Sequence, residues 1–313
     1  MNPRCVLVLL LAASWPRPAH AFCRTNTCQV DNTCTRDDQG CSVGGLPAHW
    51  ASGCLSFSMQ AEGSPLQGIS VEAALDVAHD AFSLWTEAKC HAGGTPPLTF
   101  QARGEVECHV PEFNCNPADP NANVIMFQDE GWTHSPAALA VTCVTLNLRT
   151  GEILDADMEI NTTPPYWDFS LPGGSTGADL HTVITHEAGH FVGLDHSTLT
   201  GAVMYESYDD TVLLSSLSDD DIAGVCSIYP GTGSDPECAS LPLPDDTSCV
   251  GESACVPMKK ESEGCSCSVA ERSTGPGMWF GLLAGLGCLR RTRRKARRAP
   301  AGRRAMLWAR GAD

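Results

Sequence analysis

Apolar and polar positions follow two different periods in the central part of the chain, and the period separates predicted helices from predicted strands. In the segment 70–90 apolar residues recur every three or four positions, which predicts a long helix with Ser70 as its N-cap. A second long helix is predicted over 179–192 and a third helix over 218–228. Ser218 caps the third helix, and three aspartates in its first turn stabilise the helix by interacting favourably with the positive end of its dipole.

Shorter runs rich in β-branched and aromatic residues predict the strands. These runs lie at Cys54–Gln60, 98–105, 123–130, 138–147 and 152–161. The last two predict a hairpin, because the turn sequence Arg-Thr-Gly at 149–151 separates them. The segment 50–230 mixes helix and strand patterns without long low-complexity runs, so we interpret it as one α+β domain.

The ends of the chain differ from this domain. An apolar run at 5–14 after a positive residue, followed by the small-x-small sequence at 19–21, predicts a signal peptide over 1–21 and a mature start at Phe22. The remainder divides by composition into a cysteine-rich lead-in (22–49), the domain (50–230), a cysteine-rich linker or tail (231–268) and a C-terminal signal (269–313). An exported chain reaches an oxidising compartment, which fits its 17 cysteines.

Cysteine usage predicts disulfides and not a cysteine zinc site. Cys5 belongs to the signal peptide, ten cysteines lie from Cys23 to Cys226, and five more follow Pro230 before the apolar run near the C-terminus. The even number of ten predicts a disulfide framework, whose connectivity the sequence does not determine. No CxxC pair is placed against another pair, so a cysteine zinc ribbon is not expected.

Charge is distributed unevenly along the chain. The formal net charge is −17, yet residues 22–274 carry 36 Asp and Glu against 8 Lys and Arg, a net of −28. Ten of the twenty Lys and Arg lie in 290–310. An ectodomain this acidic is not expected to bind nucleic acid by counterion release, and we expect a soluble monomer.

The strongest chemical signal is the sequence HEAGHFVGLDH at 186–196. Residues four apart share one face of a helix, so His186 and His190 can both direct a ring nitrogen at one ion about 2.0–2.1 Å away, the usual zinc–imidazole distance. Gly193 can adopt a positive φ, which lets the helix end in a sharp turn that returns His196 as the third ligand. Water would hold the open fourth position of a catalytic site. The full pattern arises by chance in roughly one chain of this length in a hundred thousand.

Glu187 lies next to the first histidine and can reach the site without ligating the ion. Zinc lowers the pKa of its bound water toward 7, and Glu187 is placed to take the proton of that water as it attacks a peptide carbonyl. This predicts a zinc endopeptidase acting on proteins or peptides. Two alternatives stay open: a non-catalytic, zinc-stabilised surface-binding or adhesion module, and a zinc hydrolase of cell-wall peptides. The intact Glu187 argues against the first, because a structural zinc site is closed by a fourth protein ligand.

The motif HExxHxxGxxH with a later methionine is the metzincin signature, and the chain resembles the matrixin branch of that group. HEAGHFVGLDHS, GAVMY at 201–205 and LSDDDIAGVCSIYP at 217–230 carry the resemblance, which covers about 50–230. It implies a metzincin (zincin-like) fold, in which a mixed twisted sheet packs on two long helices plus a C-terminal helix, here with disulfide bonds.

The resemblance also implies roles for residues around the motif. Met204 would form an apolar floor beneath the zinc and would not be a ligand. Residues 206–216 would wall the pocket for the substrate side chain, and ALAVT at 138–142 would be the edge strand to which an extended peptide adds. Glu206 stands where matrixins usually carry proline, so this pocket is expected to differ from theirs.

Other parts of the chain depart from the matrixin pattern. Matrixins hold a structural zinc with several histidines before the edge strand, and His134 is the only histidine of that region, so a second zinc is not predicted. Nothing matches the inhibitory propeptide motif PRCGxPD; Cys41 in GCSVGGLP is the nearest candidate, and ordinary disulfide pairing is favoured for it.

An acidic strand face is the candidate for a further cation site. Asp155, Asp157 and Glu159 alternate along the strand 152–161, so they share one face. They could help to bind Ca²⁺, which takes hard oxygen ligands. The same pattern could equally mark a solvated strand face, and the sequence leaves both interpretations open.

The C-terminal part gives a second resemblance. GCSCSVAERS at 264–273, the uncharged apolar run 277–289 and the following arginine cluster resemble the tripartite C-terminal sorting signal of exported myxobacterial proteins. The resemblance implies processing and retention at the outer cell surface, with a lipid on Cys265 or Cys267 as one route. The run has about thirteen residues, fewer than the roughly 20 of a membrane span, which favours a transient or processed anchor.

Overall fold

The computed structural model of the chain describes residues 21–30, 32–113, 122–164, 167–174, 177–208, 215–232, 238, 263–267 and 306–307. The predicted signal peptide up to residue 20, the apolar run 277–289 and the arginine cluster lie outside these residues. Within the described part, no helix is long and apolar enough to cross a membrane.

Three α-helices form where the spacing of apolar residues predicts them. They are α1 (Val71–Thr86), α2 (Leu180–Phe191) and α3 (Asp219–Ile228), and a short 3₁₀ turn, η1 (Thr27–Gln29), precedes them. Each α-helix begins at a side chain that accepts a backbone N–H of the first turn: Ser70 from Ala73, Asp179 from Thr182 and Ser218 from Asp221. The three N-termini are therefore set by local side chains.

The first helix is shorter than the predicted 70–90. It ends at Thr86, and the chain then makes a turn at 90–94: Gly93 N donates to Cys90 O (2.8 Å) and Cys90 N donates to Gly94 O (3.0 Å). Two glycines with positive φ make this turn possible, and it directs Cys90 toward its disulfide partner, Cys226.

Six strands form one mixed sheet in the order β13-β7-β8-β6-β4-β5. Their bounds are β4 Cys54–Gln60, β5 Thr99–Val106, β6 Val124–Phe127, β7 Ala140–Asn147, β8 Ile153–Ile160 and β13 Glu263–Cys267. Strand β4 has the predicted bounds, and β7 and β8 form the predicted hairpin as an antiparallel pair. The pairs β4–β5, β4–β6 and β6–β8 are parallel, and β13 lies antiparallel on the outer side of β7.

Four short strand pairs complete the described structure. They are β1 (Cys23–Arg24) with β11 (Leu194–Asp195), β2 (Thr35–Arg36) with β3 (Ser42–Val43), β9 (Phe169–Ser170) with β10 (Ala178–Asp179), and β12 (Ser207–Tyr208) with β14 (Met306–Leu307). Of these pairs, only β9–β10 is parallel. The pair β1–β11 joins the lead-in to the segment directly after α2.

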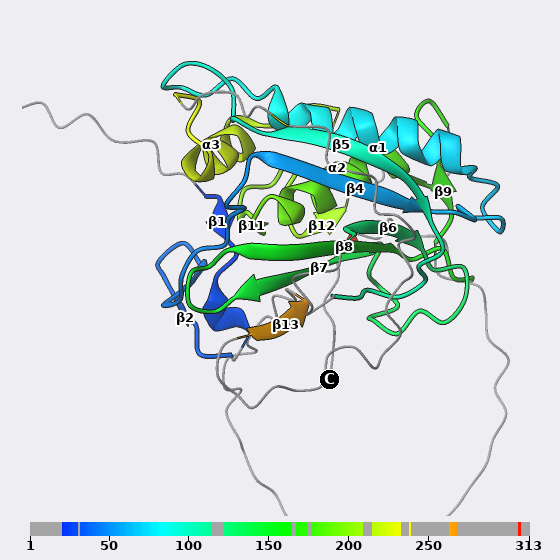
Figure 1. Ribbon diagram of the computed structural model, residues 1–313, viewed down its shortest axis with the longest axis horizontal. Coiled ribbons are helices and arrows are strands. Elements are labelled where there is room, and N and C mark those ends of the chain that lie inside the picture. The colour runs from blue at the N-terminus through cyan, green and yellow to red at the C-terminus, as the bar shows by residue number, and fades with distance from the viewer. Residues whose placement is uncertain are drawn as a thin grey trace, which may run out of the picture.

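The helices α1 and α2 pack against each other beside the parallel strands (Figure 1). Phe82 of α1 lies at the centre of this contact, with its ring centroid 4.9 Å from that of Phe57 on β4 and 5.2 Å from that of Phe191 on α2. Trp85 Nε1 donates to Thr185 O (2.9 Å), so the buried indole fills the core and ties the two helices together. This packing fixes α2, which carries the histidine motif.

The disulfides join parts that are distant in the sequence. The described pairs are Cys23–Cys41, Cys28–Cys34, Cys54–Cys238 and Cys90–Cys226, and Cys108 and Cys143 are also disulfide-bonded. The even number of cysteines from Cys23 to Cys226 suggested that these ten pair only with one another, and this expectation is wrong. The reason is that Cys54 on β4 pairs with Cys238, which ties the beginning of the cysteine-rich tail to the sheet.

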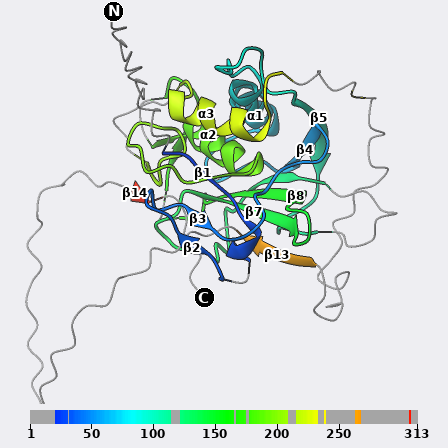
Figure 2. The same cartoon turned by 90° about the vertical axis from the view of Figure 1, so that its left-hand side faces the viewer.

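The lead-in packs on the domain along the side that carries the histidine motif. Figure 2 shows it running from beside α3, past α2, toward the outer side of β7. Two of the disulfides, Cys23–Cys41 and Cys28–Cys34, lie within it. A segment with few apolar residues is held in shape by such cross-links, because it cannot build a core of its own.

Candidate metal centre

Three histidine rings converge at the end of α2. His186 and His190 lie one turn apart on this helix, and His196 follows β11. Nε2 of His190 is 3.2 Å from Nε2 of His186 and 3.2 Å from Nε2 of His196. Among the described residues, these histidines form the one group of three or more His, Cys, Asp or Glu whose ligand atoms all lie within 4.8 Å of one another.

The hydrogen bonds of two rings define which nitrogens face the centre as lone pairs. Nδ1 of His186 lies 2.6 Å from Val203 O, and Nδ1 of His190 lies 2.9 Å from Leu194 O. A carbonyl oxygen can only accept, so each Nδ1 carries the proton and each Nε2 of the neutral ring carries a lone pair. Lone pairs that face one another at 3.2 Å repel, and a cation between them converts the repulsion into binding.

The spacing of these nitrogens fits an ion of the size of zinc. Two ligands at about 2.0–2.1 Å from one tetrahedral ion lie roughly 3.3–3.4 Å apart, close to the observed 3.2 Å. The pKa of His186 lies well below its usual value, mainly because the ring is buried and, to a smaller extent, because His190 and His196 are close. The ring is therefore in the neutral form that binds a metal.

Gly193 makes the turn between the second and third histidines. Its φ is +100°, and its N–H donates to His190 O (2.9 Å) directly after the end of α2. A Cβ at this position would lie 2.9 Å from Ala48 O. Both the left-handed φ and the close approach of Ala48 therefore require glycine here.

Met204 lies beneath the helix that carries two of the histidines. The residue is buried, and a Cβ placed on Gly189 of α2 would lie 2.1 Å from Met204 Sδ. The thioether therefore fills the space that a side chain at Gly189 would take. Met204 O also accepts the N–H of Ser197 (2.7 Å), which links this turn to the residue after His196.

Asp221 fixes the turn that contains Met204, and no local pattern indicates this role beyond the Ser-x-x-Asp capping pattern of α3. Its carboxylate accepts the N–H groups of Val203 (2.8 Å) and Met204 (3.0 Å) and the N–H of Ser218 (2.8 Å). The same turn presents the carbonyl that receives Nδ1–H of His186. A buried carboxylate on α3 therefore orients one ring of the histidine cluster through the backbone.

Glu187 is buried beside the histidines and is held from the edge of the sheet. Its Oε2 accepts a hydrogen bond of 2.6 Å from Thr142 Oγ1 on β7. Burial raises the pKa of Glu187, while the electrostatic influence of the neighbouring His190 ring and the hydrogen bond from the Thr142 hydroxyl oppose the rise. The contact with Thr142 has no local signal in the sequence, because the two residues are 45 positions apart.

The acidic face of β8 is buried, so the interpretation as a solvated strand face is wrong. Asp155, Asp157 and Glu159 are 2%, 1% and 6% exposed. Asp157 accepts the N–H groups of Glu112 (2.8 Å) and Val124 (2.7 Å). Burial, opposed by these two donors, raises the pKa of Asp157 to about 7. His134 Nε2 lies 2.8 Å from the carboxylate of Glu159.

The expected substrate cleft is only partly covered by the described residues. Of the segment 206–216 that was expected to wall the side-chain pocket, residues 209–214 lie outside them. The expected edge strand is described: β13 pairs with β7 over Cys143–Asn147, and in the described part no strand lies on the outer side of 138–142.

An α+β domain in which one helix supplies two histidines, a glycine turn returns a third and a buried glutamate lies beside them has the architecture of a metallopeptidase domain. The family model described as Matrixin matches residues 49–230, more than half of the chain. The chain belongs to the matrixin family, which is zinc-dependent and in which calcium is common.

Individual relatives match a shorter stretch. Metalloendoproteinase 1-MMP of Arabidopsis thaliana is 46% identical over 63 residues, which cover 20% of this chain and 17% of the relative. The hatching enzyme of Paracentrotus lividus is 46% identical over 57 residues (18% and 10%), and matrilysin of Mus musculus is 42% identical over 65 residues (20% and 24%). The chain thus spans a quarter or less of each of these relatives.

Proposed function

We propose that the chain is an exported zinc endopeptidase that hydrolyses peptide bonds in proteins or peptides. His186, His190 and His196 would bind the zinc, and Glu187 would act first as general base and then as general acid. The observation that carries this proposal is the convergence of the ring nitrogens, 3.2 Å apart, beside a buried glutamate that is not one of the converging groups.

Zinc, when bound, would lower the pKa of a water molecule toward neutrality and polarise the peptide carbonyl. Glu187 takes the proton of the attacking water and then delivers it to the departing amine. Thr142 holds the carboxylate in one orientation, so the proton is taken from a fixed position. The raised pKa of Glu187 suits a group that must both accept and donate a proton near neutral pH.

An extended substrate would bind along the outer edge of β7. The segment 138–142 ends at Thr142, whose hydroxyl donates to Glu187. A peptide paired with this segment would therefore pass beside the metal centre. Backbone hydrogen bonds of this kind hold a peptide with little dependence on its sequence. We therefore expect unfolded or flexible protein segments to be cut in preference to folded domains.

The disulfides support an exported protein, because such bonds persist in oxidising compartments. Retention at the cell surface through the C-terminal signal stays a prediction, since its apolar run 277–289 and its arginine cluster lie outside the described residues. Ca²⁺ binding by Asp155, Asp157 and Glu159 also stays a prediction. Two observations support it: calcium is common in the family, and the three carboxylates are buried on one strand, β8.

The test uses the full chain, purified with its disulfides intact. Zinc content is measured first, and then the cleavage of an unfolded protein by the wild type, by the wild type with a zinc chelator and by Glu187→Gln. We expect one zinc per chain, and cleavage by the wild type that is lost with chelator and reduced at least about a thousandfold in Glu187→Gln, because the amide cannot take the proton that the carboxylate takes.

Two results would contradict the proposal. A chain that binds no zinc lacks the metal centre altogether. A chain that binds one zinc yet cuts no unfolded protein or peptide would instead be a zinc-stabilised binding module.

A further inference from the structure

Four consecutive carbonyls after the second histidine accept hydrogen bonds from residues outside α2. The donors are Trp50 Nε1 to Phe191 O (2.8 Å), Tyr229 Oη to Val192 O (3.1 Å), Thr25 N to Gly193 O (3.0 Å) and Thr25 Oγ1 to Leu194 O (3.0 Å). Two of these four bonds come from one residue of the lead-in. The path of the chain from His190 to His196 is therefore fixed in part by Thr25.

The carbonyl of Leu194 is shared by Thr25 and a ring of the histidine cluster. It accepts Thr25 Oγ1–H at 3.0 Å and His190 Nδ1–H at 2.9 Å. Thr25 is 2% exposed, so water does not replace its hydroxyl. A hydroxyl on one lone pair of this oxygen holds the carbonyl in the direction in which the other lone pair receives the imidazole N–H.

A second lead-in residue reaches the third histidine through Asp195. Gln29 Nε2 donates to Asp195 Oδ2 (3.2 Å), and Asp195 Oδ1 accepts the backbone N–H of His196 (2.8 Å). The orientation of the Gln29 amide is set by its other end, because Oε1 accepts the N–H of Asn26 (2.6 Å). The side chain is thus aimed at Asp195 by the lead-in itself.

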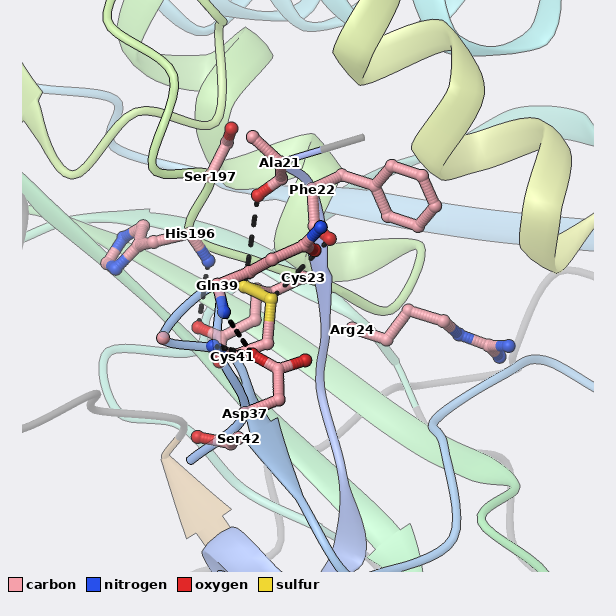
Figure 3. Close-up of a disulfide and its surroundings, with 12 residues drawn as sticks. Ala21, Phe22, Cys23, Arg24, Asp37, Gln39, Cys41, Ser42, His196 and Ser197 are labelled. Atoms are coloured by element: carbon pink, nitrogen blue, oxygen red, sulfur yellow. Dashed lines mark hydrogen bonds between the residues drawn. A yellow bond between two sulfur atoms is a disulfide. The ribbon is translucent and has the colours of Figure 1, made fainter. Parts of the chain in front are cut away.

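The cross-links of the lead-in lie close to these contacts. Figure 3 shows the Cys23–Cys41 disulfide near His196 and Ser197. The second disulfide, Cys28–Cys34, includes a residue of η1, the turn that also carries Gln29. The match to the matrixin family begins at residue 49, so Thr25, Gln29 and both disulfides lie outside the matched range.

We propose that the lead-in is a working part of the metal centre, with Thr25 and Gln29 as positioning residues for His190 and His196. This inference rests on the proposed zinc site. Neither residue is placed to touch the metal or the substrate; each acts through a backbone or carboxylate group that orients a histidine. Losing such a partner typically weakens metal binding 10–100-fold, because the ligand must then be ordered when the metal binds.

The experiment measures zinc affinity of the full, oxidised chain by competition with a chromophoric chelator, together with the absorption bands of the Co²⁺-loaded protein. Thr25→Val keeps the shape of the side chain and removes its donor, whereas Thr25→Ser keeps the donor. Thr27→Val is the matched control, since the Thr27 hydroxyl accepts Leu46 N (2.9 Å) within the lead-in and no described contact links its side chain to the histidine loop. Gln29→Met provides a second test at a side chain that is less buried than Thr25.

We expect Thr25→Val to bind zinc roughly tenfold to a hundredfold more weakly and to shift the Co²⁺ bands. We expect Thr25→Ser to stay within about threefold of the wild type, Gln29→Met to lose roughly tenfold, and Thr27→Val to lose stability without losing zinc affinity. If Thr25→Val does not fold, Gln29→Met carries the test.

The failures of the two proposals are distinguishable. A wild type without zinc binding removes the proposed function. A wild type that binds zinc and cleaves, while Thr25→Val and Gln29→Met bind zinc as tightly, removes only the role of the lead-in. Equal losses of affinity in Thr25→Val and Thr27→Val would show a general loosening of the lead-in and would also overturn the assignment.

Discussion

The carboxylate of Asp221, on α3, accepts the backbone N–H of Met204 at 3.0 Å, and this bond joins α3 to the turn that lies against Gly189 of α2. Its other oxygen accepts the N–H of Val203 (2.8 Å) and the hydroxyl of Ser218 (2.7 Å). One buried side chain therefore closes the capping box of α3 and also fixes the turn whose carbonyl orients His186.

Replacing Asp221 by alanine should destabilise the fold and weaken metal binding together. The change leaves buried N–H groups without an acceptor, at about 1–3 kcal/mol for each, so we expect a loss of about 3 kcal/mol or more. Urea unfolding of the zinc-free, oxidised chain measures it. Asp219→Ala is the control, because Asp219 is exposed in the same helical turn and should cost at most about 1 kcal/mol. Similar losses in both variants would refute the role given to Asp221.

Gly189→Ala should overpack the space between α2 and Met204. The added Cβ would lie 2.1 Å from Met204 Sδ and 2.8 Å from Trp85 Cζ2, so the thioether must move or the helix must shift. Overpacking of this kind costs about 1–3 kcal/mol, and a displaced helix would also disturb His186 and His190. Thermal unfolding and zinc titration of the single variant report both effects.

The double variant with Met204→Ala separates a steric clash from other causes. If Met204 is the obstacle, removing its side chain should return part of the stability lost in Gly189→Ala, and the two changes will not be additive. Strict additivity would mean that the alanine at 189 acts through something other than Met204.

Much of this architecture could be predicted because its causes are local. The N-caps Ser70 and Ser218 precede their helices directly, and the histidine motif lies within eleven residues of sequence, so helical spacing alone brings two of its rings together. The burial of the acidic face of β8 could not be predicted, because its partners are distant in sequence: Glu112 N donates to Asp157, and Gln128 and His134 contact Glu159. The bond between Thr142 and Glu187 likewise depends on the packing of β7 against α2.

Thr142→Val should lower catalysis with little effect on folding. The valine keeps the shape of the side chain and removes the hydroxyl that donates to Glu187 Oε2. A hydrogen bond to a charged group contributes about 1.5–3 kcal/mol, so kcat/KM should fall roughly tenfold to a hundredfold. Peptide cleavage at saturating zinc measures it, with Thr142→Ser expected near the wild type. A Thr142→Val enzyme as active as the wild type would show that Glu187 is held in place by other groups.

The buried carboxyl of Asp157 should make stability depend on pH. Its pKa is about 7 in the folded chain, raised by burial and, to a smaller extent, by Glu159 and Glu112, against roughly 3.9 in the unfolded chain. Between these values the folded state keeps a proton that the unfolded state has lost. Stability from this group is therefore complete below about pH 4, falls as the pH rises toward 7, and changes no further above it; the total is about 4 kcal/mol.

Asp157→Asn should remove this dependence, because the amide does not titrate. The measurement is the free energy of unfolding in urea from pH 4.5 to 8, with the metal-free, oxidised chain, for the wild type and the variant. The amide faces a backbone N–H that the carboxylate accepted, so the variant carries a constant cost, and the difference in slope is the result that matters. Parallel curves would show that Asp157 is ionised throughout. If the acidic face binds Ca²⁺, millimolar Ca²⁺ should stabilise the wild type at pH 7.5 much more than Asp157→Asn, because the ion favours the charged carboxylate.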